Sequence, residues 1–415
     1  MPAAPFVPSL AWALPFAALL LSIAVFPLAL PRFWESNLRK LAVAALLGTP
    51  VFVLYLRAHP AALVETAGDY VSFIVLLGGL FVISGGVFLD GDLEATPRTN
   101  TAILASGALL ASFVGTTGAS MLLVRPLLQT NRERQHVAHT VVFFIFLVSN
   151  VGGCLTPLGD PPLFLGYLEG VPFAWTLRLF LPWLFTVSLL LAAYFLCDVR
   201  AHAREVRQDL RRDFYEVRPL RIAGKESLAL LGGVLAAVAF LGAPWREIAI
   251  LALAAFSFAR TDPALHKANH FTFHPILEVA ALFAGIFVTM LPALDLLRAR
   301  GAELGVREPW QFFWATGALS SFLDNAPTYL TFLALGQGLG LPAEVVGVSH
   351  RVLVAISLGA VFMGANTYIG NGPNFMVRTI AEERGVKMPS FGGYMLWSGV
   401  VLLPVFVLVT LVFIL

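Results

Sequence analysis

The chain has 415 residues, of which 58% are hydrophobic and only 13% carry a charge. Soluble domains carry about 25% charged residues, so the composition excludes a soluble enzyme, a disordered chain and a nucleic-acid-binding protein. One transmembrane helix needs about 20 apolar residues, and the hydrophobic content is enough for about twelve such segments. The sequence therefore predicts a polytopic integral membrane protein.

The apolar segments fall into two groups on either side of a charged stretch. They lie near residues 9–30, 41–56, 70–89, 100–129, 136–170 and 174–197, and then near 227–243, 247–260, 273–294, 309–339, 344–384 and 390–415. We expect an all-α protein in which residues 1–197 and 227–415 are two repeats. Residues 198–226 are expected to form a basic linker with an amphipathic interfacial helix.

The distribution of lysine and arginine predicts the orientation in the membrane. The linker holds eight of these residues, which places it in the cytoplasm by the positive-inside rule. If segments 100–129 and 309–339 are re-entrant hairpins, 20 basic residues fall on the cytoplasmic side and six outside. We expect a multi-pass protein of the bacterial inner membrane.

Four segments are interrupted by residues that break helices. Segments 100–129 and 309–339 are too long for one span and are polar near the middle, as hairpins would be. Segments 136–170 and 344–384 each contain a patch rich in Gly, Pro and Asn, which predicts a broken helix. Irregular backbone at membrane depth is tolerated only where it is buried in protein or lines a cavity. These four places are the expected functional positions.

The interrupted segments resemble each other in pairs. GALLASFVGTTGAS (107–120) parallels GALSSFLDNAPT (317–328), with Ser112 matching Ser321 at an offset of 209 residues. GGCLTPLGDPPLF (152–164) parallels MGANTYIGNGPNF (363–375) at an offset of 211 residues, which matches Asp160 with Asn371. Each half then has five spans and one hairpin. Because five is an odd number of membrane crossings, the second half has the opposite orientation to the first. Inverted repeats with broken helices are the architecture of secondary transporters.

Each half contributes one carboxylate to these motifs. Asp160 precedes Pro-Pro in the first broken helix, and Asp324 lies at the tip of the second hairpin. A carboxyl at membrane depth is costly when charged and can exchange H⁺ for Na⁺. Either residue could instead cap the helix that follows it. For Asp160 the two interpretations have equal weight, whereas for Asp324 the functional one is favoured.

Other ionisable residues are secondary candidates. Arg351 is expected about two turns into its span, as the partner of an acid or of an anionic substrate. Glu278 lies one turn from His274 near the end of a span, where solvation is the default and a proton relay the alternative. His136 and His139 are expected on the surface. We find no phosphate-binding loop, nucleophile elbow or metal-binding motif, so neither an enzyme nor a bound cofactor is expected.

At these motifs the chain resembles the ion transporter superfamily, which includes citrate and dicarboxylate carriers, arsenite permeases and D-type sodium/proton antiporters. The resemblance implies a homodimer whose protomers have a scaffold and a mobile transport domain. By position it also implies two half-sites. The first would contain Thr116, Thr117, Asn150, Gly153 and Thr156, and the second Asp324, Asn325, Asn366, Thr367 and Asn371. Asp-Asn-x-Pro at the second tip is similar to the antiporter branch.

The leading hypothesis is therefore a Na⁺(Li⁺)/H⁺ antiporter that works by elevator-type alternating access. Asp324 and Asp160 would bind the cation or the proton in turn, and the candidate Na⁺ ligands are Asp324, Asn150 and Asn366. The alternative is symport of citrate or another di- or tricarboxylate with a cation, and export of arsenite ranks third. Expected partners are the lipid bilayer and a second copy of the chain, and no nucleic acid.

Overall fold

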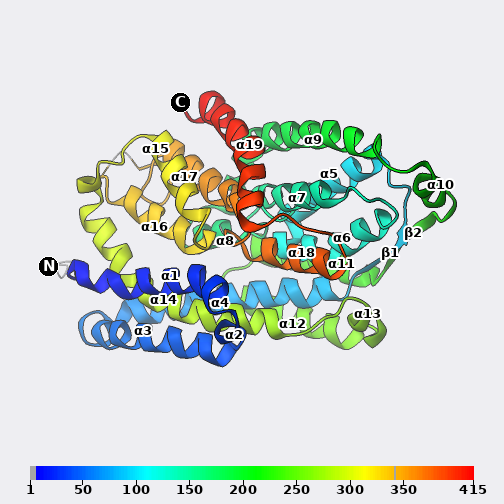
Figure 1. Ribbon diagram of the computed structural model, residues 1–415. Coiled ribbons are helices and arrows are strands. Elements are labelled where there is room, and N and C mark those ends of the chain that lie inside the picture. The colour runs from blue at the N-terminus through cyan, green and yellow to red at the C-terminus, as the bar shows by residue number, and fades with distance from the viewer. Residues whose placement is uncertain (1–5, 341–342) are drawn as a thin grey trace.

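The computed structural model describes residues 6–340 and 343–415, and there the chain is mostly helical (Figure 1). The first-half helices are α1 (Leu14–Ala29), α2 (Pro31–Trp34), α3 (Asn37–Ala58), α4 (Pro60–Gly85), α5 (Pro97–Val114), α6 (Thr116–Thr130), α7 (Ala138–Leu147), α8 (Pro161–Leu168) and α9 (Phe180–His202). The remaining helices are α10 (Arg207–Tyr215), α11 (Lys225–Phe240), α12 (Trp245–Arg260), α13 (Pro263–Ala268), α14 (His274–Arg300), α15 (Pro309–Ser320), α16 (Asn325–Gln337), α17 (His350–Met363), α18 (Gly372–Glu383) and α19 (Phe391–Val409). The predicted all-α class is confirmed. Residues 1–5 of the predicted first repeat and 341–342 of the second lie outside the described residues.

Six helical stretches of the described chain are long and apolar enough to cross a membrane. They are Leu10–Pro27, Asn37–Ala58, Pro60–Gly85, Phe173–His202, His274–Leu304 and Phe391–Ile414. In five of them less than half of the apolar window is buried inside the protein. Their outward faces carry large apolar side chains such as Leu21, Leu46 and Leu396, which is the surface that lipid requires. The protein is therefore an integral multi-pass membrane protein, as predicted.

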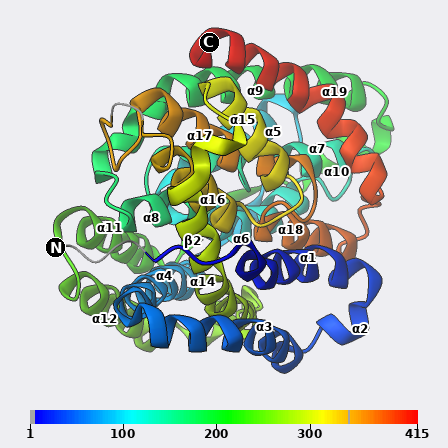
Figure 2. The same cartoon turned by 90° about the vertical axis from the view of Figure 1, so that its left-hand side faces the viewer.

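The helices form two groups that pack against each other (Figures 1 and 2). The lower group contains α1, α3, α4, α11, α12 and α14, and the upper group contains α5–α9 and α15–α19. Within the lower group, α4 and α14 are joined by the stacked rings of Phe73 and Phe283, whose centroids lie 4.7 Å apart. The same two helices contact α6, α8 and α16 of the upper group, so they form the boundary between the groups.

Both of the long polar-centred segments are split into two helices at the expected places. α5 and α6 meet at Gly115, whose φ of +83° lies in a region that L side chains rarely adopt. α15 and α16 are separated by residues 321–324, and Asp324 stands at the start of α16. The helices of each pair contact each other. The chain therefore reverses near the middle of segments 100–129 and 309–339.

The two Gly/Pro/Asn-rich patches are unwound. α7 ends at Leu147 and α8 begins at Pro161, with the 3-10 turn η2 (Val151–Cys154) between them. α17 ends at Met363 and α18 begins at Gly372, with the 3-10 turn η5 (Gly364–Asn366) between them. Proline at the first turn of α8 and α18 needs no backbone donor, so each second helix begins without penalty. Segments 136–170 and 344–384 are therefore broken, as the sequence predicts.

The basic linker is only partly helical, so the expectation of one amphipathic helix over residues 198–226 is wrong. After α10, strand β2 (Arg218–Ala223) pairs antiparallel with β1 (Phe88–Asp92), with Phe88 opposite Ala223. Pro219 interrupts helical hydrogen bonding, and Gly224 ends the strand with a φ of +73°. Figure 1 shows α10 and this sheet together at one end of the molecule.

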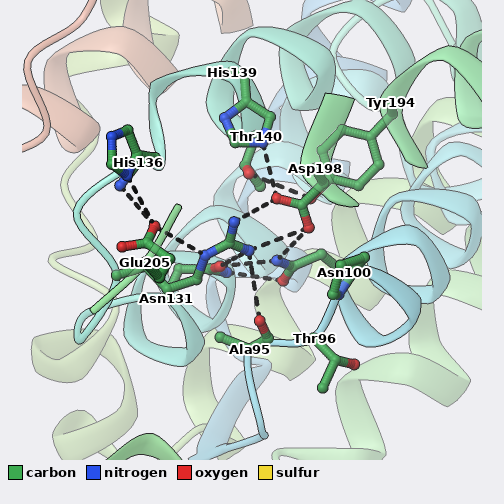
Figure 3. A network of polar contacts seen from close by, with 12 residues as sticks. Ala95, Thr96, Asn100, Asn131, His136, His139, Thr140, Tyr194, Asp198 and Glu205 are labelled. Carbon is green, nitrogen blue, oxygen red and sulfur yellow. Dashed lines mark hydrogen bonds and ion pairs between the residues drawn. The ribbon is translucent and has the colours of Figure 1, made fainter. Parts of the chain in front are cut away.

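A buried ion pair holds the start of the linker against the loop between α6 and α7. The Asp198 carboxylate, at the end of α9, accepts from Arg134 Nη2 at 2.6 Å and lies 2.8 Å from His139 Nε2. Asn100 and Asn131 exchange side-chain hydrogen bonds beside it (Figure 3). The His139 side chain is only 10% exposed, so its expected surface position is wrong because the sequence did not reveal this acid partner. His136 is 48% exposed and lies 3.4 Å from Glu205.

Candidate functional site

Asp160 lies where both halves of the chain meet. Its side chain is buried, and it accepts hydrogen bonds from Thr116 Oγ1 at 2.8 Å, Asn325 Nδ2 at 2.5 Å and Asn371 Nδ2 at 3.1 Å. These donors come from the start of α6, the start of α16 and the second break. The two hairpin tips and both unwound segments therefore converge on one carboxylate.

The helix-cap interpretation separates the two aspartates. Asp160 occupies the position before α8, but its side chain caps no backbone N–H of that helix. Asp324, in contrast, caps α16 by accepting from the backbone N–H of Ala326 at 3.0 Å. Asp324 lies near Asp160 and is only partly buried. The geometry thus makes Asp160 the central carboxylate and leaves Asp324 at the edge of the site.

The predicted threonines of the two unwound segments donate hydrogen bonds to backbone carbonyls. The Thr156 hydroxyl donates to the carbonyl of Ser112 in α5, and the Thr367 hydroxyl donates to the carbonyl of Ser321 next to α15. The hydroxyls of the same two serines donate to backbone carbonyls of the unwound segments. Ser112 donates to the Gly152 carbonyl at 2.5 Å, and Ser321 donates to the Met363 carbonyl at 3.1 Å. The same hydrogen bonds therefore occur in both halves, between serines 209 residues apart and threonines 211 residues apart. Each unwound segment is hydrogen-bonded to the hairpin of its own half.

Gly153 is the close-contact point of the first half-site. A β-carbon at this position would lie 2.6 Å from Thr116 Cγ2 and 2.9 Å from the Gly159 carbonyl oxygen. That carbonyl accepts from the Thr116 backbone N–H at 2.8 Å. Gly153 therefore belongs to the site because it lets the break approach the hairpin tip that holds Asp160.

Three asparagines of the broken helices and the second hairpin tip present buried side-chain oxygens without a donor among the described residues. They are Asn150, Asn325 and Asn366. Asn150 donates through Nδ2 to the Ile145 carbonyl at 2.8 Å and to Asn374 Oδ1 at 2.7 Å, which leaves its Oδ1 unpartnered. Asn366 Nδ2 donates to Ser321 Oγ at 2.9 Å. Neutral amide and carbonyl oxygens are the ligands with which unwound transporter helices hold small hard cations.

The remaining predicted residues lie outside this centre. Arg351 is in the first turn of α17, is exposed, and donates to the Leu415 carbonyl at 3.2 Å, so it meets neither Asp324 nor Asp295. Glu278 is paired with Lys40 of α3 at 2.6 Å. No ion pair to Asp160 or Asp324 is found among the residues that the structure describes. Within the described part of the chain, the site therefore holds two acids and no neutralising base.

A cavity of about 80 Å³ adjoins the first hairpin tip at the boundary of the helix groups. Thr116 and Thr117 line one side of it. Apolar side chains from α4 and α14, among them Leu80 and Ile276, line the other side. Thr117 therefore faces the boundary between the groups, whereas Thr116 is turned to Asp160.

Asn374 belongs to the site although the sequence prediction omitted it. Its Oδ1 accepts from Asn150, and its Nδ2 donates to the carbonyls of Gly364 and Thr367 at 2.9 Å each. The residue is fully buried. Its position one helical turn after Asn371, in a motif already rich in asparagine, was the available signal.

A family model described as "Putative citrate transport" matches residues 7–414, which is nearly the whole chain. No curated protein matches the chain.

Proposed function

Because the chain belongs to this citrate-transport family and is therefore a transporter, we propose that it is a cation-coupled secondary transporter, in the first place a Na⁺(Li⁺)/H⁺ antiporter. The observation that carries the proposal is the environment of Asp160. This buried carboxylate receives three side-chain donors from both halves of the chain and no positively charged partner among the described residues. A carboxyl with these properties can hold a proton or a small cation, one at a time.

The donors around Asp160 suit such an exchange. In the ionised carboxylate all three hydrogen bonds are made, so the site tolerates the charge without an arginine or lysine. When a cation binds, rotation of the Asn325 amide would turn its unpartnered Oδ1 towards the ion. Asn150 and Asn366 offer further neutral oxygens. Protonation of Asp160 would remove the charge that holds the cation.

The same proposal assigns roles to the two helix groups. The recurring hydrogen bonds of the two breaks support an inverted repeat, and the reversals near Gly115 and Asp324 suit re-entrant hairpins. We propose that the lower group is the scaffold and that the upper group, which carries Asp160, is the transport domain of an elevator. In this arrangement the boundary formed by α4 and α14 is the sliding surface. A homodimer in a bacterial inner membrane completes the proposal.

Symport of citrate with a cation is the second candidate, and the family description favours it. In this case the amides of Asn325 and Asn371 would leave Asp160 and donate to substrate carboxylates. An anion beside Asp160 and Asp324 would need a bound cation or proton to offset their charge, because no base lies at the site within the described residues. Both candidates therefore require a cation or a proton bound at these carboxylates.

Proton flux in proteoliposomes separates the two candidates. An internal pH dye is followed while Na⁺, Li⁺, K⁺ or citrate is added outside, for the wild type and for Asp160→Asn. We expect a proton flux driven by Na⁺ or Li⁺ without citrate, and its loss in the variant. Asp262→Asn, which changes an exposed cap of α13, is the matched control and keeps the flux. Flux that requires citrate would replace the antiporter with the symporter.

A further inference from the structure

A second polar pocket lies apart from the Asp160 site, where loops of both halves meet. It has a volume of about 490 Å³ and is formed by residues 128–138, between α6 and α7, and residues 384–387, after α18. Its charged lining residues are Arg132, Arg134, Arg384 and Lys387, and none of the described Asp or Glu residues lines it. The amides of Gln129, Asn131 and Gln135 add hydrogen-bonding groups.

Two of these cations are already neutralised. Arg134 is paired with Asp198 at 2.6 Å and lies 3.5 Å from Glu205 (Figure 3 labels both acids). Arg132 is paired with Glu133 and Glu216. These pairs leave little charge on Arg132 and Arg134 for a ligand.

The cations from the second half differ, because Arg384 and Lys387 form no ion pair within the described residues. Both side chains are exposed to the pocket mouth. Arg125 of α6 lies near Arg384, and its buried Nη1 has no hydrogen-bond partner in the described part of the chain. The acid near Arg125 is the exposed Glu383. Arg384 and Lys387, the two lining cations without an ion pair among the described residues, therefore leave a local excess of about two positive charges.

From this we infer that the pocket binds a phosphate group, either of a free phosphate or pyrophosphate or of an anionic lipid headgroup. A doubly charged anion offsets the excess charge of Arg384 and Lys387, and the guanidinium fork of Arg384 matches its oxygen geometry. The backbone N–H groups that start α7 add favourable dipoles, since Val137 and Ala138 line the pocket and no side chain caps that helix. The anion would join the end of the first hairpin to the end of α18.

Direct binding of inorganic pyrophosphate to the full-length protein in detergent tests this inference. Isothermal titration calorimetry at matched ionic strength compares the wild type with Arg384→Gln/Lys387→Gln. Arg260→Gln/Lys267→Gln is the control, because it removes the same two charges from exposed positions of α12 and α13. We expect binding to weaken about tenfold or more in the pocket variant, the effect of losing a charged hydrogen bond, and to stay unchanged in the control.

Lipid nanodiscs distinguish the two sources of the phosphate group. If a headgroup fills the pocket, phosphatidylglycerol discs weaken pyrophosphate binding relative to phosphatidylcholine discs, and if the ligand is soluble the two agree. The single variant Lys387→Glu, at an exposed position, repeats the test should the double variant fail to fold. Absence of pyrophosphate binding in both detergent and phosphatidylcholine discs, or equal binding by wild type and the pocket variants, would overturn the inference.

Discussion

The Asp160 carboxylate accepts a hydrogen bond from the Asn325 side-chain amide at 2.5 Å, although 165 residues separate them in the chain. This contact joins the first broken helix to the tip of the second hairpin. It also distinguishes Asp160 from Asp324, which is next to Asn325 in sequence and caps α16.

Asp324 is predicted to act mainly through helix capping. Asp324→Asn keeps a capping side chain and should leave both transport and stability near wild type. Asp324→Ala removes the bond to the Ala326 N–H and should lower the free energy of unfolding by about 1 kcal/mol. Denaturant unfolding together with flux assays measures both. Complete loss of flux in Asp324→Asn would make this residue a coupling group instead.

Gly153→Ala is predicted to damage the site without changing its chemistry. The new methyl group would lie 2.6 Å from Thr116 Cγ2 and would displace the Thr116 hydroxyl from Asp160. We expect at least a tenfold loss of transport rate, equivalent to about 1.4 kcal/mol. Gly399→Ala is the control, because nothing lies within 4 Å of its β-carbon position in α19. Equal rates in the two variants would show that the close contact is unimportant.

The Lys40–Glu278 pair is predicted to be structural. The Lys40 side chain is 4% exposed and lies 2.6 Å from Glu278, so Glu278→Gln would leave a buried charge unpaired. We expect the free energy of unfolding to fall by about 1–3 kcal/mol. Adding Lys40→Met to Glu278→Gln should restore part of the lost free energy of unfolding. Thermal unfolding of the single and double variants measures this recovery. A change in cation selectivity without loss of stability would point to the proton-relay role instead.

The contribution of Asp213 in the linker to stability should fall as pH rises. Burial raises the pKa of Asp213 in α10 from 3.8 to about 6, against the lowering effect of its bond to the Ala95 N–H. Between pH about 4 and 6 the folded state holds a proton that the unfolded state has lost, so the stability contribution of this group falls as pH rises. Thermal unfolding at pH 4 to 7 should show this decline in the wild type and less of it in Asp213→Asn. Identical pH profiles would contradict the assignment.

The backbone plan could be predicted from the sequence because its signals are local. Gly115 takes a positive φ that other residues rarely adopt, and the Gly/Pro patches gather several helix-disfavouring residues in one short stretch, so the reversals and breaks follow from local sequence. Contacts between residues far apart in the chain, in contrast, leave no local signal in the sequence. Strand β2 forms because β1 offers it an edge, His139 is covered because Asp198 lies beside it, and Arg351 faces out at the start of α17. For the same reason spacing alone could not rank Asp160 above Asp324.

Proton release on cation binding tests most directly the claim that Asp160 holds cation and proton in turn. Na⁺ is added to the purified protein in a weakly buffered solution while the pH is recorded, for the wild type, Asp160→Asn and Asp324→Asn. The account predicts that Na⁺ releases protons from the wild type and from Asp324→Asn, whereas Asp160→Asn releases none. Undiminished release from Asp160→Asn would contradict the central role of this residue.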